Sequence, residues 1–137
     1  MHKNRVRAAL ASVAAGGLLA AGVIAGTGQA EAASVGEWQV ARQWICSATD
    51  ARVDLTYTNA YGNTETRNNT RLVGQRSQNG AVTCIYKDLQ AGEYGGYVST
   101  HISDEDGGYV SCALFVGGRK VAESSDNSDF YSWASCY

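Results

Sequence analysis

From residue 35 onward the chain has no apolar spacing that would sustain three turns of helix. Short segments that alternate between apolar and polar residues take its place. Gly, Asn and Asp interrupt these segments at intervals of roughly ten residues, and such residues adopt turn conformations readily. The pattern predicts an all-β fold, a small antiparallel β-sandwich of about seven strands.

The clearest expected strand covers residues 53–58, where Val53, Leu55 and Tyr57 alternate with Asp and Thr. This period-two alternation is typical of a strand with one buried face. The segment 109–116 shows the same pattern. The remaining strands are expected at residues 38–44, 64–70, 81–86, 94–102, 119–124 and 130–137.

Three of the turns expected between these strands have distinct sequence signals. The dipeptides Asn79-Gly80 and Gly117-Gly118 predict hairpins, because their residues tolerate a positive φ. The acidic segment 104–108 (Asp-Glu-Asp-Gly-Gly) predicts a further turn. Its carboxylates are ligands of the kind that calcium takes, but it lacks the alternating ligands of a known calcium loop. A solvated turn without a metal is therefore expected.

The N-terminal segment differs from the rest of the chain. Lys3, Arg5 and Arg7 precede an apolar run over residues 8–25, and Ala30-Glu31-Ala32 offers an A-x-A cleavage pattern. This succession predicts a secretory signal peptide over residues 1–32, followed by one exported domain over residues 33–137. The alternative is an uncleaved anchor, since the run just reaches the shortest length of a membrane span.

All four cysteines lie within the predicted domain: Cys46, Cys84, Cys112 and Cys136. An even number in a short exported chain predicts two disulfides. A zinc site is disfavoured, because no pair has C-x-x-C spacing and His101 is the domain's one histidine. Four cysteines allow three pairings, which the spacing leaves open.

The charge of the domain excludes some partners. Eight Lys and Arg residues are interspersed with twelve Asp and Glu residues over 33–137, so there is no basic patch for nucleic acid or anionic lipid. Membrane contact is expected only if the N-terminal segment is retained. The sequence also contains no phosphate-binding or dinucleotide-binding motif, and no cofactor is expected.

No catalytic motif is present either. There is no G-x-S-x-G or H-E-x-x-H, and the spacing around His101 supplies neither a nucleophile nor an orienting acid. His101 is expected to be a half-exposed strand residue, and the protein is predicted not to be an enzyme.

Aromatic residues on the later strands form the candidate binding surface. They alternate with polar residues on strands whose other face is also apolar, so one sheet face and its hairpins would expose them. The alternative is that they pack in the core. The candidates are Tyr94, Tyr97, Tyr109, Tyr131 and Trp133.

Three segments carry a family resemblance: 53–57 (VDLTY), 110–121 (VSCALFVGGRKV) and 131–136 (YSWASC). From about Arg52 to Cys136 the chain resembles the soluble domain of the MmpS-type transport accessory proteins of actinobacteria. The resemblance implies an immunoglobulin-like sandwich with a Cys112–Cys136 bridge, which leaves Cys46 and Cys84 to pair. It also implies a non-enzymatic role at the cell envelope, assisting a membrane exporter of lipids or siderophores.

The chain departs from that family at Leu72-Val73-Gly74, where the family has Leu-Pro-Trp, and in a leader that looks cleavable. The alternative function is a secreted inhibitor of a protease or glycosidase. Small disulfide-linked β-sandwich inhibitors of α-amylase are similar in the Cys84-to-Cys112 spacing and in Gly95-Gly96-Tyr97. Their inhibitory Trp-Arg-Tyr triplet is absent here. In either case a protein partner is expected, at the envelope or in the medium.

Overall fold

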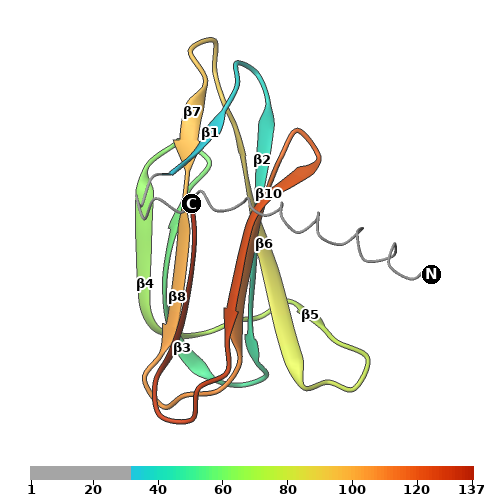
Figure 1. Cartoon of the computed structure of the whole chain (residues 1–137), viewed down its shortest axis with the longest axis vertical. Coiled ribbons are helices and arrows are strands. Elements are labelled where there is room, and N and C mark those ends of the chain that lie inside the picture. Colours follow the sequence, from blue (N-terminus) through green and yellow to red (C-terminus); the bar gives the residue numbers. More distant parts are fainter. Residues whose placement is uncertain (1–31) are drawn as a thin grey trace, which may run out of the picture. The chain divides into compact units, whose positions relative to one another are not determined.

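The computed structural model describes residues 32–137, and their strands form two facing antiparallel sheets with a small ribbon at one end (Figure 1). The predicted signal peptide lies outside the described residues except for its last residue, Ala32. Within residues 32–137 no helix has the length and apolar character needed to cross a bilayer.

The strands fall into three groups. The five-stranded sheet contains, in spatial order, β10 (Arg119–Asp126), β9 (Val110–Val116), β2 (Val40–Ala48), β6 (Val82–Gln90) and β5 (Gln75–Arg76). The four-stranded sheet contains, in order, β11 (Ser132–Cys136), β8 (Thr100–Asp104), β3 (Arg52–Thr58) and β4 (Thr64–Arg71). The ribbon pairs β1 (Ala33–Val35) with β7 (Gly96–Val98).

The structure confirms the predicted all-β antiparallel sandwich with two disulfides, but residues 32–137 form eleven strands instead of about seven. The additional strands are short, since β1 has three residues and β5 has two. The expected strand over 94–102 is divided at Ser99 into β7 and β8. Segments this short contain too few residues for alternation to reveal them.

The core lies between the two sheets, where alternate side chains of the long strands meet. Ile45 of β2 and Leu114 of β9 face Leu55 of β3 and Ile102 of β8, and all four are almost completely buried. The alternation predicted for 53–58 and 109–116 is confirmed by the burial patterns of β3 and β9. Removal of this apolar surface from water, at about 25 cal/mol per Å², is the main force that holds the sheets together.

The two disulfides occupy different places in the sandwich. Cys46 and Cys84 are direct partners on the neighbouring strands β2 and β6, with their Cα atoms 4.1 Å apart. Cys112 of β9 and Cys136 of β11 are buried, and their bond joins one sheet to the other. The pairing implied by the family resemblance is therefore confirmed.

Several strands begin later than the sequence pattern predicts. Trp38 was expected in the first strand, but it lies in the turn before β2 with a left-handed φ of 59°. Tyr94 lies in a tight turn in which Gly95 N donates to Gly92 O at 3.1 Å. The alternation of apolar and polar residues extends by chance into such turns. The strand itself begins only where backbone hydrogen bonds to a neighbouring strand begin.

The two lateral edges of the sandwich are built differently. On one edge β11 packs against β9 and β10, and the Cys112–Cys136 bond closes the edge covalently. On the other edge β4 and β6 face each other with few contacts, and residues 72–74 cross between the sheets. A Cβ atom on Gly74 would lie 2.3 Å from the Cys84 carbonyl oxygen, so the crossing segment depends on this glycine to lie directly against β6.

Candidate binding surfaces

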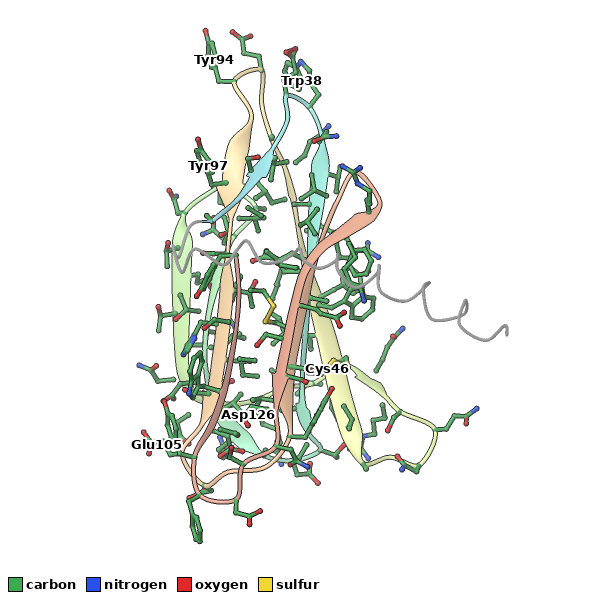
Figure 2. All side chains as sticks on the ribbon, in the orientation of Figure 1. Trp38, Cys46, Tyr94, Tyr97, Glu105 and Asp126 are labelled. Carbon is green, nitrogen blue, oxygen red and sulfur yellow. A yellow bond between two sulfur atoms is a disulfide. The ribbon has the colours of Figure 1, made fainter. Side chains whose placement is uncertain are left out.

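An exposed aromatic group lies at the end of the sandwich that carries the β1–β7 ribbon. Trp38, Tyr94 and Tyr97, called here the aromatic tip, lie together at this end (Figure 2). Their exposed fractions are 58%, 93% and 69%. Large rings with this exposure contribute nothing to the core, and they are available to a partner.

The turn that carries Trp38 is tied to the turn that carries Tyr94. Trp38 N donates to the Gly92 carbonyl oxygen at 3.1 Å, and Gln90 Nε2 donates to the Trp38 carbonyl oxygen at 3.3 Å. A left-handed backbone is rare for a bulky residue and costs about 1 kcal/mol or more. The two hydrogen bonds hold Trp38 in this conformation and fix its turn beside the turn that carries Tyr94.

The aromatic tip is acidic. Glu37 directly precedes Trp38 and Glu93 directly precedes Tyr94, so each turn presents a carboxylate beside an aromatic ring. The segments 32–41 and 91–99 contain no Lys or Arg. Each of these two turns therefore combines an exposed ring with a negative charge.

The structure brings together only two of the five sequence-predicted surface residues, Tyr94 and Tyr97. Trp133 N donates to Asp126 Oδ2 at 3.0 Å, and Asp126 lies toward the opposite end of the sandwich from the aromatic tip (Figure 2). Tyr131 lies two residues before Trp133, and both are about half exposed. Tyr109 is half-buried and lines a hollow of about 430 Å³ with Trp44 on the outer face of the five-stranded sheet.

That outer face carries a ladder of side-chain pairs between β2 and β6. Arg42 forms a bidentate ion pair with Asp88 at 2.8 Å, and its guanidinium carbon lies 3.9 Å from the centre of the Tyr86 ring. The hydrogen-bonded Arg42 guanidinium lowers the pKa of Asp88. Trp44 packs against Tyr86, with the ring centres 5.2 Å apart. These groups are paired with one another, so this face offers a partner fewer free contacts than the aromatic tip.

His101 has a partner that the sequence spacing did not reveal. His101 Nδ1 lies 2.6 Å from Ser135 Oγ, because β8 and β11 pair these residues directly. Their separation of 34 residues hides the pair from any local motif. In an activated Ser–His pair, a carboxylate accepts a hydrogen bond from the imidazole and orients it as a base. Within residues 32–137 no carboxylate forms such a hydrogen bond with His101.

The acidic turn is folded around its first residue. Asp104 is buried, and its Oδ1 accepts a hydrogen bond from Asp106 N at 2.9 Å. Glu105 and Asp106 are exposed. The described part of the chain contains no cluster of three or more His, Cys, Asp or Glu side chains placed to hold a metal ion.

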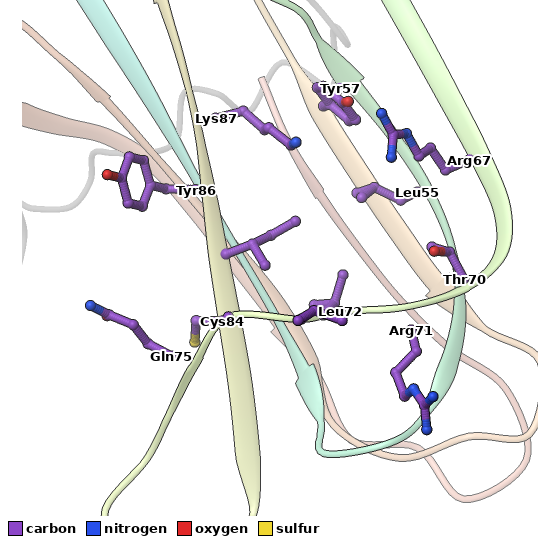
Figure 3. Close-up of a pocket in the computed structure, with 13 residues that line it drawn as sticks. Leu55, Tyr57, Arg67, Thr70, Arg71, Leu72, Gln75, Cys84, Tyr86 and Lys87 are labelled. Carbon is purple, nitrogen blue, oxygen red and sulfur yellow. The ribbon is translucent and has the colours of Figure 1, made fainter.

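The open edge contains a cleft of about 430 Å³, called here the edge cleft (Figure 3). Its apolar floor is made by Leu55, Leu72 and Ile85. Lys87 from β6 and Arg67 from β4 extend into the space between the sheets above this floor (Figure 3).

Tyr57 closes one side of the edge cleft. The Lys87 ammonium lies 5.1 Å from the centre of the Tyr57 ring. Burial, together with the hydrogen-bonded Glu65 carboxylate, raises the pKa of Tyr57, so the phenol stays neutral. Sequence reasoning missed this cleft because its residues come from both sheets, with β3 and β4 on one side, β6 on the other and residues 72–74 between them.

Comparison with known proteins adds no relative. No protein-family model matches the chain, and no curated protein matches it. The relationship to the MmpS-type proteins stays a prediction that depends on the segments quoted above.

Proposed function

We propose that this chain is an exported, non-enzymatic binding protein that engages a protein partner through the aromatic tip. The observation that carries the proposal is the backbone of Trp38, which is held in a left-handed conformation with its indole exposed. Such strain persists where surrounding contacts enforce it, and it concentrates at functional sites. Exposed Trp and Tyr side chains are also the residues that most often dominate binding energy at protein interfaces.

The tip specifies the chemistry of the partner. A complementary surface would have an apolar recess for Trp38 and Tyr94, bordered by Lys or Arg side chains that face Glu37 and Glu93. Charges at the rim of an interface mainly raise the association rate, and salt screens them. The association rate of this complex therefore falls as ionic strength rises, while the dissociation rate changes little.

Two further features favour a site of action outside the cytoplasm. Both disulfides are of the kind that form and persist in oxidising compartments. The resemblance to the MmpS-type accessory proteins makes a membrane exporter of lipids or siderophores the first partner to test.

Site-specific photo-crosslinking in the producing cells tests the proposal. Tyr94 is replaced by p-benzoylphenylalanine in one variant, and Phe130, which is 86% exposed on the turn before β11, is replaced in a matched control. We expect an adduct with one protein from position 94, its loss on Trp38→Ser substitution, and no such adduct from position 130. An adduct from position 130 alone would contradict the proposal.

A secreted hydrolase inhibitor is the second candidate, because two braced turns that project exposed rings also suit insertion into an active-site cleft. The same crosslink distinguishes the two functions by the identity of the captured protein. For an inhibitor, the purified domain would reduce the activity of the captured hydrolase, and the Trp38→Ser variant would not.

A further inference from the structure

The edge cleft concentrates positive charge in a domain that is acidic as a whole. Three of the eight basic side chains of residues 33–137 line it, namely Arg67, Arg71 and Lys87, and none of the twelve carboxylates does. Two of the cations have partners outside the lining. Arg67 pairs with Glu65 at 2.8 Å, and Arg71 lies 3.7 Å from Asp50.

Lys87 is different, because its ammonium forms no ion pair with any carboxylate of residues 32–137. The side chain is half-buried and extends from β6 towards Tyr57 of β3, across the gap between the sheets (Figure 3). The face of the Tyr57 ring attracts the cation, and no oxygen of residues 32–137 accepts a hydrogen bond from its three N–H donors. An ammonium that no carboxylate of residues 32–137 neutralises is available to bind an anion.

The apolar floor lies directly beside this charge. Leu55 and Leu72 are almost completely buried, and Ile85 packs against the core from the same side. Leu72 belongs to the segment that crosses the open edge, which Gly74 allows to lie against β6. Apolar surface and an unpaired cation thus line a single recess.

We propose that the edge cleft binds a free medium-chain carboxylate, with its alkyl chain against Leu55, Leu72 and Ile85 and its carboxylate on the Lys87 ammonium. Arg67 adds positive charge on the β4 side. The volume of about 430 Å³ is in the usual range of small-molecule sites, about 300–1,000 Å³. Because β4 and β6 flank the recess, it accepts a single chain and not the surface of a bilayer.

Titration with straight-chain acids tests this proposal. Hexanoate, octanoate and decanoate are added below their micelle concentrations, with binding followed by calorimetry and by the backbone amide NMR signals. We expect affinity to rise with chain length, by up to about fourfold per methylene. The amide shifts should map to β4, β6 and residues 72–74. Decan-1-ol, which lacks the charge, should bind more weakly than decanoate.

Two variants isolate the role of the ammonium. Lys87→Gln should weaken decanoate binding by about tenfold, as expected for the loss of a charge-assisted hydrogen bond, and should leave decan-1-ol binding unchanged. Arg119→Gln removes the same charge from the exposed start of β10, outside the cleft, and should have no effect. Melting temperatures of both variants confirm that they fold.

Four results would overturn the proposal, and the first three concern decanoate and the two variants. They are the absence of saturable decanoate binding, equal losses in the two variants, or amide shifts outside the edge cleft. Binding to phosphatidylglycerol vesicles without binding to monomeric decanoate would also overturn it, because a membrane surface would then be the ligand. The aromatic tip shares no residue with the cleft, so none of these results bears on the proposed protein partner.

Discussion

The side-chain amide of Gln43 pairs with the backbone of Thr58 much as a neighbouring strand would. Thr58 N donates to Gln43 Oε1 at 3.0 Å, and Gln43 Nε2 donates to the Thr58 carbonyl oxygen at 2.7 Å. Thr100 Oγ1 donates to the same Oε1 at 2.8 Å. Gln43 belongs to the five-stranded sheet and both threonines to the other, so one fully buried amide joins the two layers.

Replacement of this amide should be costly. Gln43→Leu leaves the N–H and C=O groups of Thr58 and the hydroxyl of Thr100 without their partner in the core. We expect a loss of roughly 2–4 kcal/mol in the free energy of unfolding, measured by urea denaturation. Gln78→Leu, on the exposed turn before β6, is the matched control and should change it by less than about 0.5 kcal/mol. A similar small change for both variants would show that the amide is not an inter-sheet link.

The two disulfides should differ in their access to reductant. Cys46 and Cys84 are only partly buried on the outer face of a sheet, whereas Cys112 and Cys136 are 4% and 1% exposed. Limited reduction of the folded protein followed by alkylation should therefore label Cys46 and Cys84 first, as read by peptide mass spectrometry. Labelling of Cys112 and Cys136 at the same rate would mean that reduction proceeds through global unfolding.

Gly107 and Gly92 should respond unequally to substitution. A Cβ atom on Gly107 would lie 2.1 Å from the Asp129 carbonyl oxygen, and its φ is +82°. Gly107→Ala should lower the free energy of unfolding by at least about 2 kcal/mol, since strain and a backbone clash add together. Gly92→Ala meets no atom within 4 Å, and its effect should stay within about 1 kcal/mol. Equal melting temperatures of the two variants would contradict the close approach of the turn at Gly107 to the turn at Asp129.

Asp126 should make stability depend on pH in the acid range. The Ser128 hydroxyl, followed by the Trp133 amide, donates to its carboxylate and lowers its pKa in the folded protein. The unfolded value is about 3.9. Because the folded pKa is the lower one, the ionised carboxylate stabilises the fold above about pH 4, and this contribution is lost as the pH falls further.

Comparison with Asp126→Asn at several pH values checks this expectation. The stability difference between wild type and variant, from urea denaturation, should be constant at pH 5–7 and should shrink below about pH 4. Asp129→Asn removes the same charge from an exposed residue in the turn that follows β10, and it serves as the control. A difference for Asp126→Asn that does not change between pH 7 and pH 3 would contradict the role of ionisation.

Local sequence patterns predicted individual strands, their buried faces and hairpin turns. The alternation of Val53, Leu55 and Tyr57 identified a strand and its buried face, because period-two burial follows from strand geometry alone. The Gly117-Gly118 hairpin is confirmed with a positive φ at both glycines. Beyond these, the disulfide pairing came from the family resemblance and not from the spacing of the cysteines.

The candidate sites could be predicted far less well. The pairing of His101 with Ser135 and the meeting of Lys87 with Tyr57 depend on which strands become neighbours and in which register. Nothing within either segment encodes that register. Trp38 was assigned to a strand because its left-handed backbone leaves no mark in the sequence, and the aromatic tip was therefore only partly anticipated.

The contrast between the two lateral edges has a consequence for motion. The Cys112–Cys136 bond is a covalent hinge between the two sheets, whereas the opposite edge is held only by the packing of side chains around Leu72 and Lys87. Fluctuations that separate the sheets should therefore widen the gap between β4 and β6, while the edge that carries the disulfide stays closed. Amide protons of β4 and β5 should exchange with solvent sooner than those of β8 and β9, and a molecule that fills the edge cleft should slow them.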